Sequence, residues 1–68
     1  MATEDERLSK LVHDLRTPLT VVAGFAEILQ RRGPDLEQAQ RDEYLSRIVE
    51  GTQEMRDILD QERATRGS

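Results

Sequence analysis

The sequence of 68 residues contains no cysteine and one histidine, and aromatic residues make up only 3% of it. Without cysteine the chain can form neither a disulfide nor a thiolate metal site. One histidine is too few for an ordinary zinc site, so we expect no bound metal. A chain this short also buries too little surface to be comfortably stable alone. Association with a second copy is the remaining route to stability.

Long apolar runs are missing as well. No run approaches the roughly 20 residues that span a bilayer, and no signal-peptide pattern opens the chain. The formal net charge of -4 argues against nucleic acid as a partner. We therefore expect a soluble chain that does not itself contact a membrane, although it could still be a piece cut from a membrane protein.

Charged residues, in contrast, make up 35% of the sequence, as is typical of helical bundles and coiled coils. Thr3 and Glu6 have the spacing of a capping box and predict a helix start. Apolar residues then recur every seven positions and predict a helix over about residues 3–32. The main series is Leu8, Leu15, Val22 and Leu29, and a second series, Leu11, Val12, Leu19 and Ala26, is expected to complete the same stripe.

Gly33 and Pro34 form the one strong break, and they predict a turn over about residues 33–37. Asp35 and Gln38 have the spacing of a weak capping box. A second helix is predicted over about residues 38–64, because apolar side chains again follow helical spacing there. That stripe contains Leu45, Ile48, Val49, Thr52, Met55 and Leu59, with Tyr44 at its edge.

The sequence thus predicts an all-α protein, an antiparallel helical hairpin that forms a single domain over residues 1–68. Each helix carries one apolar stripe, and two helices alone leave a flank of each stripe in water. Two hairpins packed together close the core as a four-helix bundle. We therefore expect a homodimer.

Pro18 breaks a local rule, because proline inside a helix removes a hydrogen bond and costs about 3 kcal/mol. Such exceptions often mark functional sites. At about 100° per residue, His13 is expected to face solvent, with Asp14 to one side of the core. The same outward strip contains Thr17, Thr20, Val21 and Gly24.

His13 could act as a nucleophile, because an ordinary imidazole is mostly neutral at pH 7 and has a free lone pair. A carboxylate that accepts the N–H of one ring nitrogen leaves the other nitrogen to attack, and Asp14 is the nearest such group. Phosphoryl transfer requires little of the acceptor beyond an in-line, correctly charged nucleophile. Structural explanations remain open: His13 as a surface residue, Pro18 as a simple bend, and Gly24 as a site of close packing.

The eight residues His13-Asp14-Leu15-Arg16-Thr17-Pro18-Leu19-Thr20 resemble the H-box of the dimerisation and histidine-phosphotransfer domain of bacterial sensor histidine kinases. The resemblance extends over nearly the whole chain. It implies that His13 accepts the γ-phosphate of ATP and passes it to an aspartate of a response regulator. Asp14 would be the general base, and Thr17 would position a water molecule for phosphatase activity.

The resemblance also implies that Pro18 lets the first helix bend during signalling. A response-regulator receiver domain would dock near Thr20, Val21 and Gly24. The ATP-binding catalytic domain of the parent kinase would bring ATP and Mg²⁺.

No glycine-rich phosphate loop occurs in the sequence, and its four glycines are isolated. We therefore expect no cofactor in this stretch and no autophosphorylation by it alone, as for a domain cut from a longer kinase. Two alternatives remain open. One is a signal-transmitting dimerisation coiled coil with a degenerate site, and the other is a standalone histidine phosphotransfer protein.

Overall fold

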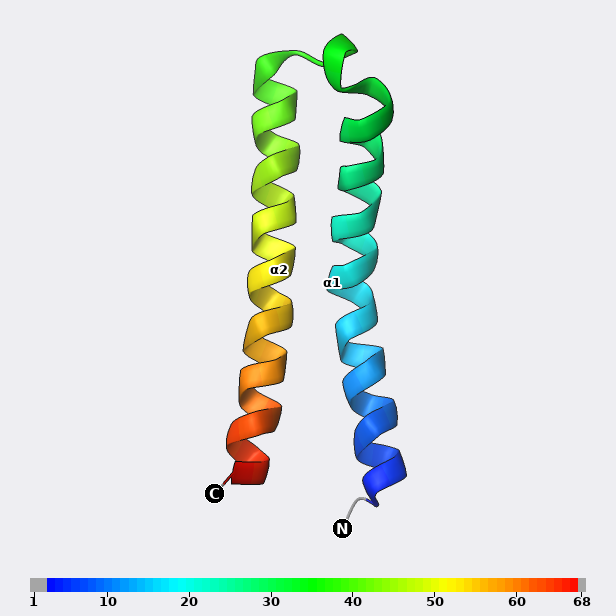
Figure 1. Cartoon of the computed structure of the whole chain (residues 1–68), viewed down its shortest axis with the longest axis vertical. Helices are drawn as coiled ribbons and strands as arrows, with labels where there is room; N and C mark the ends of the chain where they lie inside the picture. The colour runs from blue at the N-terminus through cyan, green and yellow to red at the C-terminus, as the bar shows by residue number, and fades with distance from the viewer. Residues whose placement is uncertain (1–2, 68) are drawn as a thin grey trace.

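Two long antiparallel helices lie side by side in the computed structural model (Figure 1), which describes residues 3–67, and side chains as far as residue 64. Helix α1 spans Glu4–Arg32, a 3-10 helix η1 spans Gly33–Asp35, and helix α2 spans Gln38–Gly67. These residues contain no strand, so the predicted all-α hairpin is confirmed. Residues 1, 2 and 68 of the predicted domain lie outside the described part.

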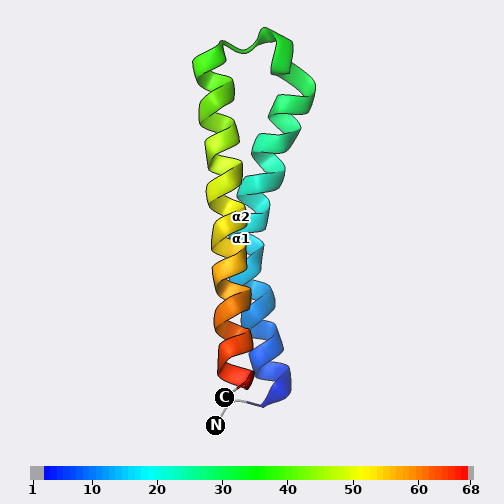
Figure 2. The ribbon, with the colours of Figure 1, turned by 60° about the vertical axis from the view of Figure 1, so that its left-hand side comes forward.

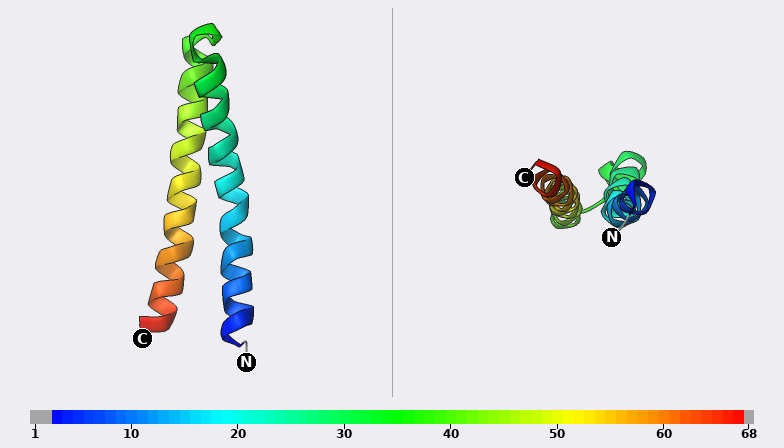
Figure 3. Two further views of the ribbon diagram at one scale, coloured as in Figure 1. Left: turned by 45° about the vertical axis from the view of Figure 1, so that its right-hand side comes forward. Right: turned by 90° about the horizontal axis from the view of Figure 1, so that it is seen from below.

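The hairpin is a single layer. Its principal extents are 51 × 19 × 12 Å, and the shortest is close to the diameter of one helix. Seen end on, the two helices lie next to each other, and no other described element covers either side (Figure 3). Within residues 3–67, neither helix has a stretch long and apolar enough to cross a membrane.

The start of α1 is the predicted capping box. Thr3 Oγ1 accepts a hydrogen bond from the Glu6 backbone N–H at 3.2 Å, and the Thr3 N–H donates to Glu6 Oε2 at 3.4 Å. The first turn carries three acids and the last turn carries Arg31 and Arg32. Both sets oppose the partial charges of the helix ends and so stabilise α1.

The turn closes through the short helix η1. Gly33 is right-handed, with φ -47° and ψ -52°, and not left-handed. The chain tightens into η1, where Pro34 begins a helical turn and its missing N–H costs nothing. Asp35 lies within η1, and α2 begins at Gln38, so the residue just before α2 is Glu37, whose N–H donates to Gln40 Oε1 at 3.2 Å.

Pro18 and Gly51 are the buried residues where the helices meet. A Cβ added to Gly51 would lie 2.5 Å from Val22 Cγ2 and 3.4 Å from the Pro18 carbonyl oxygen. Towards the turn, the rings of Phe25 and Tyr44 pack with their centroids 5.1 Å apart. At the other end, Arg7 and Glu62 form an ion pair at 3.6 Å. The contact between the helices therefore runs along almost their whole length.

The apolar stripes are wider than this contact, and a flank of each stripe is exposed in the hairpin alone, as the sequence predicted. Leu11, Leu15 and Val22 are half-buried, but Ala26 and other members of the expected stripe are exposed. A straight helix drifts by about 20° per heptad relative to a seven-residue repeat, and one neighbouring helix covers only part of so wide a stripe. Apart from Val21, which is 40% exposed, the exposed large apolar side chains retain 49–65% exposure, and they are Leu8, Val12 and Leu19 of α1 with Leu45, Val49 and Leu59 of α2.

These six side chains lie on one side of the hairpin. At about 100° per residue, Leu8 and Leu19 lie roughly a quarter turn from the α2-facing side of α1, and Leu45 and Leu59 are rotated similarly on α2. The two helices are antiparallel (Figure 2). In an antiparallel pair, rotations of the same sense along the two chains point to the same side of the hairpin. We call this set of six residues the open apolar face.

Candidate functional site

The His13 side chain projects from α1 into solvent, and 84% of it is exposed. Its Nδ1 lies 3.5 Å from Asp14 Oδ1. This is longer than an ordinary hydrogen bond of about 2.7–3.2 Å, so the structure places the carboxylate beside Nδ1 without a hydrogen bond between them. The Asp14 side chain is 41% exposed, since Asp14 lies nearer the α2-facing side of α1. In this pair, Asp14 therefore lies on the side nearer α2, and His13 lies on the side that is open to solvent.

The pairing determines which ring nitrogen is free. A carboxylate that accepts the Nδ1–H of an imidazole stabilises the tautomer with its lone pair on Nε2. Such a carboxylate also fixes the ring orientation. Because Asp14 lies beside Nδ1, Nε2 at the far edge of the His13 ring is the atom available to an electrophile.

The rest of the predicted strip is exposed as well. Thr17, Thr20, Val21 and Gly24 are all solvent-accessible, in agreement with the helical spacing. The Thr20 hydroxyl donates to the Arg16 carbonyl oxygen at 2.8 Å, so it is partly occupied by its own helix. A Cβ added to Gly24 would meet nothing within 4 Å. Gly24 is therefore a flat, open position on one side of the strip. The strip is therefore accessible to a macromolecular partner.

Pro18 is placed differently from its neighbours. Its ring is fully buried and faces α2, and α1 continues through it as one helix. Because proline has no N–H, it cannot donate to the carbonyl oxygen of Asp14, four residues earlier. The backbone carbonyl that lacks this hydrogen bond therefore belongs to Asp14, one member of the pair beside His13.

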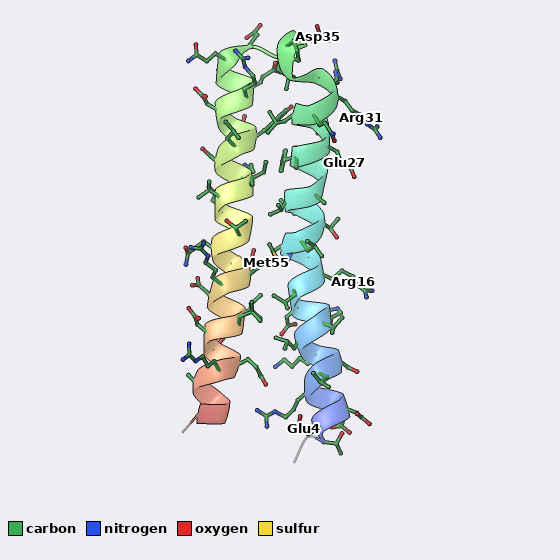
Figure 4. All side chains as sticks on the ribbon, in the orientation of Figure 1. Glu4, Arg16, Glu27, Arg31, Asp35 and Met55 are labelled. Carbon is green, nitrogen blue, oxygen red and sulfur yellow. The ribbon has the colours of Figure 1, made fainter. Side chains whose placement is uncertain are left out.

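Two residues of the site region were not identified from the sequence. Arg16 borders a shallow groove beside His13, and its side chain projects away from α2 (Figure 4). Gly51 forms the close contact with Val22 and Pro18. Arg16 could have been noticed by its position three residues after His13. Gly51 could have been noticed because it lies seven residues from both Tyr44 and Ile58, within the apolar stripe of α2.

Comparison with known families agrees with this geometry. Residues 3–65 match the family model HisKA, described as the His Kinase A (phospho-acceptor) domain. Searches of curated proteins and of solved structures found no match. Among the described residues, no group of three or more His, Cys, Asp or Glu side chains could hold a metal ion. Because the match covers α1, the turn and nearly all of α2, the chain belongs to the His Kinase A (phospho-acceptor) domain family of the histidine kinases, which act in two-component phosphorelay signalling.

Proposed function

We propose that this hairpin is the phosphoacceptor and dimerisation domain of a sensor histidine kinase, with His13 as the phosphorylated residue. The observation that carries the proposal is the exposed imidazole with a carboxylate beside Nδ1 and a free Nε2. The family match gives the same general role. ATP and Mg²⁺ are brought by the catalytic domain of the kinase, and the reaction takes place in the cytoplasm.

In the first step, the Nε2 lone pair attacks the γ-phosphorus of ATP from the side opposite the bond to ADP. The N–P bond forms as the P–O bond to ADP breaks, and ADP leaves with the electron pair. Asp14 accepts the Nδ1 proton and so opposes the positive charge that develops on the ring. In the second step, an aspartate of a receiver domain attacks phosphorus, the P–N bond breaks with its electron pair returning to Nε2, and Asp14 returns the proton to Nδ1, which restores neutral His13.

The exposed strip next to His13 is the proposed receiver-docking surface. Thr20, Val21 and Gly24 supply a small, open area on which another backbone can approach closely. Thr17 lies one turn after His13 and is exposed. We assign to its hydroxyl the positioning of the water that removes phosphate from the receiver domain.

A second copy of the chain is the proposed occupant of the open apolar face. Burial of apolar side chains is worth about 0.8 kcal/mol per methylene group, so six half-exposed large residues favour association strongly. Two hairpins packed by this face form a four-helix bundle with His13 outside it. The dimer therefore covers the apolar side chains and leaves the phosphoacceptor accessible.

The decisive experiment mixes the hairpin with a separately made catalytic domain and labelled ATP, with His13→Gln as the control. Acid-labile label on the wild type alone supports the proposal, because a phosphoramidate bond is acid-labile and Gln offers no nucleophile. Absence of label, with a folded dimer shown by sedimentation and a catalytic domain active on another hairpin, would favour the dimerisation-only alternative.

A further inference from the structure

A shallow groove of about 320 Å³ runs along the outside of α1 beside the phosphoacceptor. Leu8 and Val12 of the open apolar face form its apolar side, and Ser9, His13 and Arg16 form its polar side. The groove therefore joins the proposed dimer face to the proposed site of phosphorylation. A group attached to Nε2 of His13 would lie at its polar side.

The spacing of the polar residues suits contact with such a group. Side chains three or four positions apart on a helix are neighbours, with Cβ atoms about 5–6 Å apart. Ser9 lies four residues before His13, and Arg16 lies three residues after it. A hydroxyl and a guanidinium thus flank the imidazole from the preceding and following turns.

Arg16 also differs from Arg7 and Arg47 in its partners. Arg47 forms ion pairs with Glu43 and Glu50, at 3.9 and 3.8 Å, and Arg7 pairs with Glu62. Arg16 forms no ion pair within the part of the chain that the structure describes. Positions three and four away from it are occupied by Val12, His13, Leu19 and Thr20, none of which is acidic.

We propose that Arg16 is a positioning residue that binds the phosphoryl group carried by His13, with the Ser9 hydroxyl as a second donor. This rests on the proposed function. A guanidinium donates paired, charge-assisted hydrogen bonds to phosphoryl oxygens. Because the guanidinium binds the dianionic phosphoryl group more strongly than the monoanionic one, Arg16 lowers the pKa of the phosphoryl group. The same contact slows hydrolysis of the phosphoryl group until a receiver domain binds.

The test uses the full chain phosphorylated chemically with phosphoramidate, so that no catalytic domain is required. The ³¹P NMR signal of phosphoryl-His13 is followed against pH, and its decay is followed at fixed pH. We expect Arg16→Gln to raise the pKa of the phosphoryl group and to shorten its half-life by about three- to tenfold, the range expected for the net contribution of one ordinary hydrogen bond. Arg16→Lys should restore much of the pKa shift.

The matched control is Arg47→Gln, which removes an arginine that already has carboxylate partners on α2. It should change neither the titration nor the half-life. Circular dichroism checks that each variant remains helical. If Arg16→Gln and Arg47→Gln titrate alike, the proposal is wrong, even where the catalytic-domain assay labels His13. If that assay fails while Arg16→Gln still shifts the titration, the proposed kinase role fails and the anion contact stands.

Discussion

The two broad sides of the hairpin differ sharply in chemistry although they are built from the same two helices. The open apolar face carries leucines and valines from both helices. The opposite side carries Thr17, Val21 and Gly24 of α1 beside Arg47 and its ion pairs on α2. His13 lies on the outer edge of this second side, which we call the His13 face. The open apolar face extends from Leu8 to Leu19 on α1 and from Leu45 to Leu59 on α2.

The difference indicates which side can be covered permanently. Large apolar side chains gain free energy when they leave water, so the open apolar face favours a lasting partner. Exposed ion pairs such as those of Arg47 contribute little, commonly about 0–1 kcal/mol, and they are solvated equally well without a partner. The His13 face therefore loses little by remaining open to partners that bind briefly and leave.

The largest effect is expected from a charge placed on the open apolar face. Val49 is 65% exposed there, and Val21 is 40% exposed on the His13 face. Val49→Asp should convert the dimer to monomer at micromolar concentration, because a buried unpaired carboxylate is costly. Val21→Asp should remain dimeric and instead slow phosphotransfer to the receiver domain. Sedimentation of both variants at equal concentration measures the difference, and equal dissociation of the two would contradict the division between the faces.

Much of the fold follows from local features of the sequence. The capping box of Thr3 and Glu6 and the break at Gly33 and Pro34 depend on neighbouring residues, so short-range patterns are enough to place them. The backbone conformation of Gly33 does not follow from such patterns, since Pro34 favours a right-handed 3-10 turn that the sequence pattern alone does not distinguish from a left-handed one.

The site was predictable only in part. The outward direction of His13 and Thr17 follows from helical spacing, and the structure agrees. The half-burial of Asp14 was missed because the contact with α2 centres near Pro18 and not on the heptad series. The role of Gly51 depends on which residue of α1 lies opposite it, and that alignment is set by the turn and by packing along both helices. The chemical roles assigned to these residues remain predictions.

Two glycines allow a matched comparison: Gly51 lies in the contact between the helices, and Gly24 lies on the His13 face. Replacing glycine by alanine within a helix gains about 1 kcal/mol from propensity. Gly24→Ala should show that gain, since the new Cβ meets open space. Gly51→Ala should instead lose up to about 2 kcal/mol overall, because its Cβ would clash with Val22, and overpacking costs about 1–3 kcal/mol, which offsets or exceeds the gain from propensity. Thermal unfolding measures both, and stabilisation by Gly51→Ala would show that the helices can separate there at no cost.

The smallest effect is expected at Pro18, where two terms oppose each other. Pro18→Ala restores a backbone hydrogen bond and removes a steric clash, a gain of about 3 kcal/mol. It also removes two ring methylenes of a fully buried side chain, a loss of about 1.6 kcal/mol at 0.8 kcal/mol per group. We expect a net stabilisation of about 1 kcal/mol in denaturant unfolding.

Pro34→Ala is the control for Pro18→Ala, because Pro34 is exposed at the start of η1 and should change stability very little. Clear destabilisation by Pro18→Ala alone would mean that packing of the ring against α2 outweighs the missing hydrogen bond. The proline beneath His13 would then be a structural anchor of the hairpin. Stabilisation would instead mean that α1 keeps a costly residue beside the proposed phosphoacceptor, as expected if the helix bends there during signalling.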